Sequence, residues 1–226
     1  TFIFSNDHFP IASRAMQQYW RKLPETHKWQ RGQKTIDVLS TIKHIAQNGA
    51  LLKVQFTPEK ETVNQVLILV DNQGSMSAFE DLSKMIVDSI EQAFGEQSDS
   101  FERNTRVCYF YNIPAPYIYK DPAHTEAVSL EEEINRCKSK RHHIIIISDA
   151  GAARGNNVVK RVMGTMRALF KWNTAKANIV WLNPMPRSRW EGNAAERIAK
   201  FVSMHSIDSD QEVLNAIRNL KQRANN

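Results

Sequence analysis

Cysteine is scarce in this chain, where Cys108 and Cys137 stand alone among 226 residues. Two thiols make neither a disulfide framework nor a C-x-x-C metal pair, which argues against a disulfide-stapled secreted domain. Long apolar runs are also missing, because the longest lies in HHIIIISDA at 142–150 and is far too short to cross a bilayer. We therefore expect a cytoplasmic protein without membrane insertion.

The beginning of the chain, TFIFSNDHFP, lacks the basic, apolar and small-residue order of a secretory signal. It also lacks an initiating Met, so the chain is expected to be a fragment of something longer. Hydrophobic residues at 42% and charged residues at 24% are ordinary values for a globular protein. The length favours one domain, or one domain with an appendage.

Acidic residues are fewer than basic ones, 24 Asp and Glu against 30 Lys and Arg, so the net charge is +6 and the pI is near 9.3. Such a balance suits an anionic partner, nucleic acid included. Lys and Arg are nevertheless scattered, and no motif of a nucleic-acid-binding fold accompanies them. The distribution favours a solvated basic face, with passive nucleic-acid binding as an alternative.

Strand-like and helix-like segments alternate along the chain. Helices are expected twice within 10–48, then at 77–94, 129–138, 158–172, 194–202 and 210–223, from their apolar periodicity. Strands are expected at 50–58, 65–71, 105–112, 142–147 and 178–184, with a short antiparallel neighbour at 116–120. This order predicts a doubly wound, mostly parallel α/β sheet flanked by helices. We expect an N-terminal helical extension with a short strand at 1–60 and the α/β domain at 61–226.

Two strands end in acidic turns. Asp71 follows VLILV, and Asp149 follows IIIIS, so both lie at carboxyl ends of strands, where ligands bind in such sheets. The small residues after Asp71 include Ser75 and Ser77, and Gly151 follows Asp149. Carboxylates and hydroxyls on one rim suit a hard cation such as Mg²⁺.

The order Asp, Gly-Ser-Met, and a later strand ending Ser-Asp-x-Gly resembles the von Willebrand factor A (VWA) domain. The resemblance implies a metal-ion-dependent adhesion site built from Asp-x-Ser-x-Ser, a Thr and a second Asp. Asp71 matches the first aspartate, Ser75 the second serine and Asp149 the later aspartate. Gln73 stands at the first serine position, and Thr125 is the candidate for the threonine.

Five longer phrases make the chain similar to the CoxE-like branch of bacterial VWA proteins. They are TIDVLSTIKHIAQNGALL, LVDNQGSMSAFEDLS, YFYNIPAPYIYKDP, IISDAGAARG and WLNPMPRSRWEG. This resemblance implies a non-enzymatic adaptor that grips a protein partner in a larger assembly, often beside a MoxR-type AAA+ ATPase. Fold resemblance alone does not fix function.

The acidic turns have two interpretations. In the first, Asp71, Ser75 and Asp149 hold a divalent cation whose open position is completed by an acidic group of a partner. In the second, the turn is cation-free: Asp71 accepts backbone N–H bonds, Ser75 caps the following helix, and Arg154 neutralises Asp149.

A proline-stiffened loop, WLNPMPRSRWEG, offers a partner-binding lip. Arg187, Arg189 and Trp190 belong to residue types enriched in binding hot spots, and Arg154 lies on the same rim. The alternative is that Trp190 folds back over the sheet edge and the arginines are solvated.

Catalytic motifs are lacking. Ser75 lies in no G-x-S-x-G elbow, and the DNQGSMS turn has no P-loop lysine. His124, His142, His143 and His205 are expected to be structural. The enzymatic alternative is a metal-dependent phosphohydrolase or nuclease that uses Asp71 and Asp149 as ligands.

Overall fold

The computed structural model describes residues 11–23, 27–50, 54–62, 65–95, 105–138, 142–154, 159–174 and 177–224. They fall into two compact units. The larger unit consists of Thr1–Pro24 and Asn64–Asn226, and the smaller is Glu25–Val63. The expected boundary at residue 60 lies close to the second junction, whereas the first helix belongs to the larger unit and not to an N-terminal extension.

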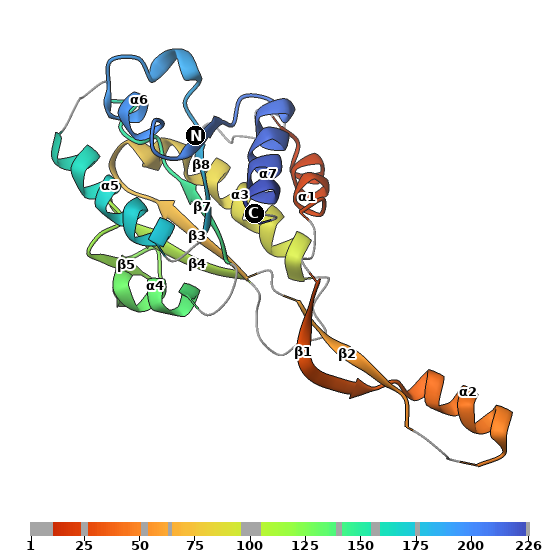
Figure 1. Cartoon of the computed structure of the whole chain (residues 1–226). Helices are drawn as coiled ribbons and strands as arrows, with labels where there is room; N and C mark the ends of the chain where they lie inside the picture. The colour runs from red at the N-terminus through yellow and green to blue at the C-terminus, as the bar shows by residue number, and fades with distance from the viewer. Residues whose placement is uncertain are drawn as a thin grey trace. The chain divides into compact units, whose positions relative to one another are not determined.

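The larger unit is built on a seven-stranded, mostly parallel sheet, which confirms the predicted α/β class (Figure 1). The strand order is β6-β5-β4-β3-β7-β8-β9. Its parallel strands are β3 (Gln65–Asp71), β4 (Thr105–Phe110), β7 (His142–Ile147), β8 (Asn178–Asn183) and β9 (Ser203–Ser206). The antiparallel strands are β5 (Tyr117–Tyr119), expected from the sequence, and β6 (Ala127–Ser129).

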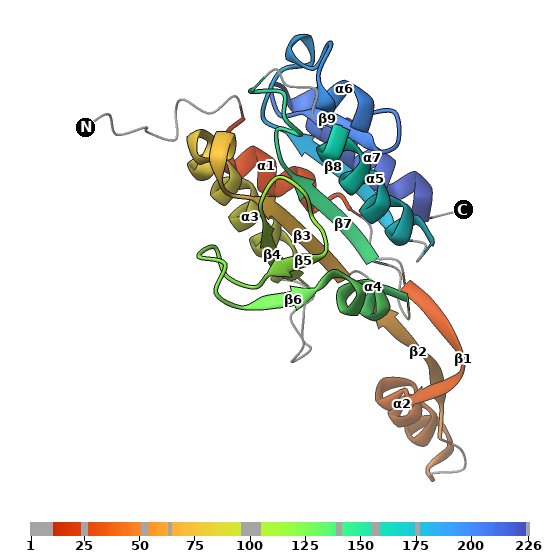
Figure 2. The ribbon, with the colours of Figure 1, turned by 90° about the vertical axis from the view of Figure 1, so that its left-hand side faces the viewer.

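Helices cover both faces of this sheet (Figure 2). One face carries α4 (Leu130–Lys138), α5 (Val159–Thr174) and α6 (Ala194–Ile198). The other carries α1 (Ser13–Trp20), α3 (Glu80–Gly95) and α7 (Asp210–Ala224). Short 3₁₀ helices, η2 (Gly74–Phe79) and η3 (Arg187–Arg189), follow β3 and β8.

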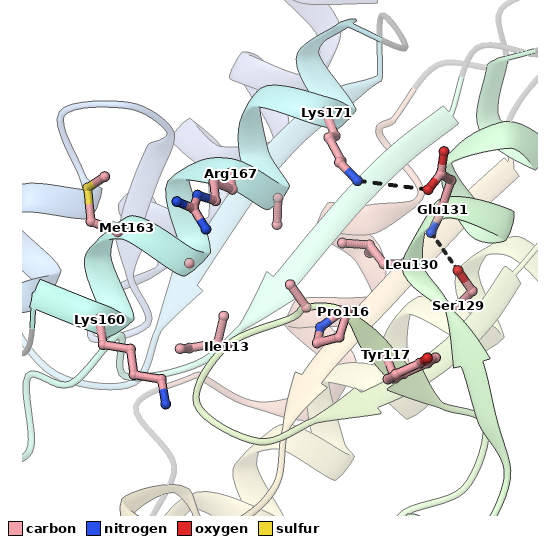
Figure 3. A pocket seen from close by; sticks show the side chains of 13 residues that line it. Ile113, Pro116, Tyr117, Ser129, Leu130, Glu131, Lys160, Met163, Arg167 and Lys171 are labelled. Atoms are coloured by element: carbon pink, nitrogen blue, oxygen red, sulfur yellow. Dashed lines mark hydrogen bonds and ion pairs between the residues drawn. The ribbon is translucent and has the colours of Figure 1, made fainter.

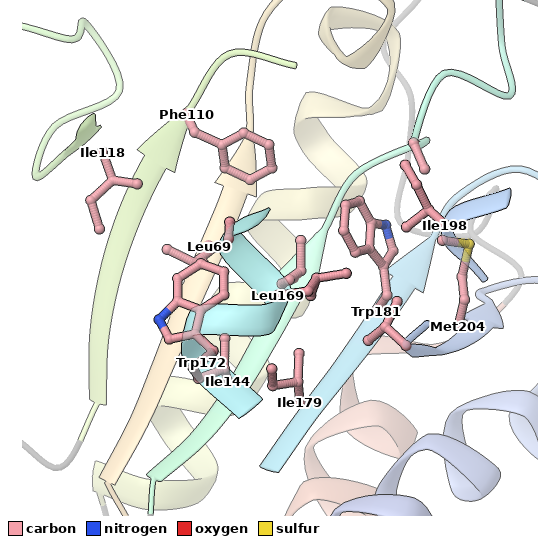
Figure 4. Close-up of a cluster of buried hydrophobic side chains, with 14 of the residues drawn as sticks. Leu69, Phe110, Ile118, Ile144, Leu169, Trp172, Ile179, Trp181, Ile198 and Met204 are labelled. Carbon is pink, nitrogen blue, oxygen red and sulfur yellow. The ribbon is translucent and has the colours of Figure 1, made fainter. Parts of the chain in front are cut away.

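The alternation of side chains along β3 supplies both cores. Leu67 and Leu69 face α5, while Val66, Ile68 and Val70 face α3 and α7. Figure 4 shows the first cluster, in which Trp172 of α5 and Trp181 of β8 are completely buried. Both faces of the central strands are therefore buried, as their continuous apolar sequences predict.

The smaller unit contains a strand that the sequence did not indicate. Its antiparallel strands β1 (His27–Ile36) and β2 (Phe56–Thr62) flank α2 (Val38–Asn48). The expectation of helix throughout 10–48 is therefore wrong at 27–36. The strand expected at 50–58 overlaps β2 only at its end, and its residues 51–53 lie outside the described residues.

The ends of α2 follow ordinary capping rules. The Asp37 carboxylate accepts the Ser40 N–H at 2.9 Å, and Gly49 has φ of +71° just beyond the helix. Across the described part of the chain, no helix has the length and apolar character needed to cross a membrane. The segment TFIFSNDHFP, on which the fragment prediction rests, lies outside the described residues.

Candidate functional site

The two acidic turns meet at the carboxyl edge of the sheet. Asp71 ends β3, and Asp149 follows β7 by two residues. β3 and β7 are neighbouring parallel strands with Val70 paired to Ile147, so the sheet brings the two carboxylates to one edge. Both side chains are buried, at 3% and 2% exposed. Because a buried carboxylate is costly without partners, their contacts define what this edge can bind.

Asp71 is held from two neighbouring strands. The Ser148 hydroxyl donates to its Oδ2 at 2.9 Å, and the backbone N–H of Asn112 donates to its Oδ1 at 3.2 Å. Burial raises the pKa of Asp71 from 3.8 to about 6, and these two hydrogen bonds oppose the rise. The negative charge of Asp71 is therefore destabilised in the folded protein.

Asp149 is bound by its own turn. The N–H groups of Gly151 and Ala153 donate to its two carboxylate oxygens, each at 3.0 Å. Ala150 and Gly151 have φ of +52° and +87°, a left-handed path that Ala rarely takes. This turn folds the backbone around the carboxylate, so that both oxygens of Asp149 have partners.

A buried arginine supplies the positive charge of this edge. Arg161 of α5 is 7% exposed, and its Nη2 donates to Asn112 Oδ1 at 2.7 Å. Its Nη1 lies so close to Gly151 that a Cβ added there would be only 2.1 Å away. Among the described residues Nη1 has no hydrogen-bond partner. The charge of Arg161 helps to lower the pKa of Asp71.

Within the described residues, no hydrogen bond joins Gln73, Ser75 or Thr125 to either aspartate of this edge. Gln73 is exposed, and its amide lies 3.3 Å from Nδ1 of His124. Ser75 lies inside η2 and not at its N-cap, so it does not cap the helix as the cation-free interpretation expected. Thr125 is exposed, and its backbone N–H donates to the Asp121 carboxylate at 3.0 Å.

Hydrogen bonds and one buried positive charge surround the two aspartates at the place where Mg²⁺ is expected. Each of the four carboxylate oxygens accepts a hydrogen bond, and the charge of Arg161 opposes the binding of a cation beside it. Within the described residues, no three His, Cys, Asp or Glu side chains gather to hold a metal ion. The geometry favours the cation-free interpretation, with Arg161 and not Arg154 as the balancing charge.

Added Mg²⁺ is expected to leave the melting temperature of the protein unchanged. A cation bound at a hundred times its Kd would add about 2.7 kcal/mol to the free energy of unfolding and raise the melting temperature. Thermal unfolding with saturating MgCl₂, against NaCl of equal ionic strength, makes the measurement. A rise in melting temperature that disappears in Asp71→Asn would contradict this expectation.

Arg154 lies against the first turn and not at Asp149. A Cβ added to Gly74 would be 2.3 Å from its Nη2 and 3.5 Å from the Tyr111 ring, so the guanidinium covers that glycine. No ion pair between Arg154 and Asp149 is present in the described structure. The predicted neutralisation of Asp149 by Arg154 is therefore wrong.

The expected partner-binding lip keeps its arginines at the surface but buries its tryptophan. Trp190 is 6% exposed, and its Nε1 donates to the Met185 carbonyl at 2.9 Å. Arg187 is held by Glu212, with 3.3 Å between Nη2 and Oε2. Arg189 is exposed. Trp190 is thus a core residue that covers the sheet, which leaves this loop without its aromatic anchor.

His124 serves local structure. His124 stacks on Tyr119 with ring centres 4.3 Å apart, and its Nε2 lies 2.7 Å from Asn72 Oδ1. His143 is buried in β7, whereas the side chain of His142 lies outside the described part of the structure. The prediction that neighbouring His142 and His143 form no common site is untested.

No family model matches the chain, and no curated protein matches it.

Proposed function

We propose that this chain is a VWA-type protein-interaction module of the CoxE-like kind, which binds a partner in a multiprotein assembly that includes an AAA+ ATPase. The motifs around Asp71 and Asp149 support this proposal, as does the sheet that carries them. Its acidic edge is a structural element balanced by Arg161 and performs no catalysis. A gene for an AAA+ ATPase next to the gene for this chain would support the choice of partner.

A groove beside the acidic edge is the observation that carries the proposal (Figure 3). It has a volume of about 570 Å³ and runs between α5, the start of α4 and the loop after β4. Its apolar side chains include Ile113, Leu130 and Met163, the last of which is 50% exposed. Gly164 lets the loop approach α5, because a Cβ there would be 2.9 Å from Ile113.

Positive charge lines one side of this groove. Figure 3 shows Lys160, Arg167 and Lys171 along α5, all exposed. Lys171 lies 4.0 Å from Glu131, the one carboxylate among the lining residues. In the described structure neither Lys160 nor Arg167 forms an ion pair. An apolar floor with a basic wall fits a peptide segment that carries both apolar and acidic side chains.

A fluorescently labelled peptide with alternating leucine and glutamate pairs is expected to bind this groove. Reversing the charge of the wall in Lys160→Glu/Arg167→Glu should weaken binding at least about tenfold, since each lost charge pair at an interface costs about 1 kcal/mol or more. Fluorescence anisotropy at two salt concentrations measures both the affinity and its electrostatic share.

The matched control is Arg189→Glu, which reverses an exposed arginine on the loop after β8. Its affinity for the peptide should equal that of the wild type. If Arg189→Glu loses binding while the double variant at 160 and 167 keeps it, the interface lies on the loop and the groove assignment is wrong. A scrambled peptide of equal charge shows how much of the binding depends on the apolar floor.

A further inference from the structure

Four polar side chains converge beside β9, the edge strand next to β8. Ser203 and His205 stand two apart on the edge strand β9, so both point to one face. Glu212 and Asn219 stand seven apart on α7, which is two helical turns and also one face. The packing of α7 on β9 therefore brings these residues together.

The distances between them follow the order of a hydrolase triad. Ser203 Oγ lies 3.0 Å from His205 Nε2, and His205 Nδ1 lies 3.1 Å from Glu212 Oε2. Asn219 Nδ2 is 2.6 Å from Ser203 Oγ and 2.9 Å from His205 Nε2. These distances agree with an arrangement in which Nδ1–H donates to Glu212, the Ser203 hydroxyl donates to Nε2, and Asn219 donates to Ser203 with Nε2 as its second neighbour.

The protonation state of His205 suits a general base. His205 is 5% exposed, and burial lowers its pKa below the ordinary value of 6.5, with the nearby charge of Arg187 adding to that lowering. Glu212 acts in the opposite direction, through its hydrogen bond and its charge. The imidazole is thus neutral at pH 7, with a free lone pair on Nε2 for the proton of Ser203.

Ser203, His205 and Asn219 line an open pocket of about 590 Å³, a volume in the usual range for small-molecule sites. Its apolar lining residues include Ala199, Val202 and Met204, which suit a short acyl chain. Its charged lining residues are Arg187, Glu191 and Glu196. Because Ser203 is half-buried and forms part of the lining, its hydroxyl faces the pocket and is not sealed in the core.

We infer that Ser203, His205 and Glu212 form a nucleophilic triad that hydrolyses short-chain carboxylic esters in this pocket. Ser203 Oγ attacks the ester carbonyl carbon while its proton passes to His205 Nε2. The carbon–oxygen bond to the alcohol then breaks, and the alcohol leaves with that proton. Water, deprotonated by His205, attacks the acyl-serine and releases the acid and the free hydroxyl.

Glu212 and Asn219 complete the geometry without forming bonds to substrate carbon. Glu212 is a positioning residue that holds the tautomer of His205 and stabilises the imidazolium, and Arg187 fixes its carboxylate from the other side at 3.3 Å. The Asn219 amide donates to Ser203 Oγ at 2.6 Å and is a positioning residue for that hydroxyl. This site goes beyond the proposed binding function and does not depend on it.

Labelling with a fluorophosphonate probe tests the nucleophile in the full chain. Wild-type protein should be labelled at Ser203, and p-nitrophenyl acetate should be hydrolysed above the rate of the buffer. Ser203→Ala should abolish the labelling, and Glu212→Gln should lower kcat about a hundredfold or more with little change in KM. Circular dichroism of each variant shows that it is folded.

Ser206→Ala is the matched control, since Ser206 lies on the same strand but bonds to Asp208 at 2.8 Å. It should be labelled like the wild type. Esterase activity should fall at a lower pH than an ordinary imidazole with a pKa of 6.5 would dictate, because the pKa of His205 is lowered. Absence of labelling in the wild type, or labelling that survives in Ser203→Ala, would overturn the inference and leave a purely structural polar network.

Discussion

Replacing Arg161 with methionine is expected to lower the free energy of unfolding at neutral pH by about 2 kcal/mol, the order of magnitude for the loss of a hydrogen bond from a charged donor. The substitution keeps most of the apolar stem but removes the guanidinium that binds Asn112 Oδ1 at 2.7 Å. Asn112 then loses the contact that steadies its loop, and its backbone N–H is the donor to Asp71. Asp71 meanwhile keeps its charge in a buried place with no cation nearby. Urea unfolding followed by tryptophan fluorescence gives the value.

Lys160→Met, one residue earlier on α5, is the control for helix propensity and for loss of one positive charge. Lys160 is exposed, so its replacement should change stability by less than about 0.5 kcal/mol. In the background of Asp71→Asn the cost of Arg161→Met should shrink by about 1 kcal/mol or more, because the charge that Arg161 balances is then absent. Equal costs in both backgrounds would show that Arg161 acts through packing alone.

The second large effect is a dependence of stability on pH that originates in Asp71. Its pKa is raised from 3.8 to about 6, so the folded protein binds this proton more tightly than the unfolded chain does. Protonation of Asp71 therefore stabilises the folded protein. This contribution to the free energy of unfolding is fully present below pH 3.8 and is lost as the pH rises through 6. The difference between these two pKa values corresponds to a loss of about 3 kcal/mol in the free energy of unfolding between low and neutral pH.

Asp71→Asn isolates this contribution from that of other carboxyl groups. Asparagine keeps an acceptor for the Asn112 N–H and offers an N–H to the Ser148 oxygen, so it fits the site without a charge. The variant should be less stable than, or equal to, the wild type near pH 4 and more stable at neutral pH. A difference between the two proteins that does not change with pH would rule out titration of Asp71 in this range.

The sequence predicts the central sheet well because its signal there is strong. VLILV and IIII are continuous apolar runs, which only a strand buried on both faces tolerates, and they fix where Asp71 and Asp149 stand. β1, β6 and β9 escape prediction because their sequences, such as SMHS in β9, are short or polar. Such segments become strands by pairing with neighbours distant in the chain, as β9 pairs with β8.

The chemistry of the site is harder to predict than the position of its aspartates. In the sequence Arg161 looks like an ordinary helix cation, because the segment KRVMG at 160–164 contains no sign that its side chain lies against Gly151. For Trp190 the sequence suggests an exposed anchor, because arginines surround it. In the structure its Nε1 donates to the Met185 carbonyl and the side chain is buried. Ser203, His205 and Glu212 do follow a short spacing, but only the packing of α7 on β9 joins them.

The hairpin of the smaller unit lowers the entropy cost of closing that unit's own chain. The larger unit is interrupted between α1 and β3, yet His27 and Thr62 are paired partners across β1 and β2. The two ends of the smaller unit therefore meet within that unit. Closing a flexible loop of the same length would cost about 2 kcal/mol more than closing a tight turn. The pairing of β1 with β2 thus offsets the entropy of loop closure inside the smaller unit itself.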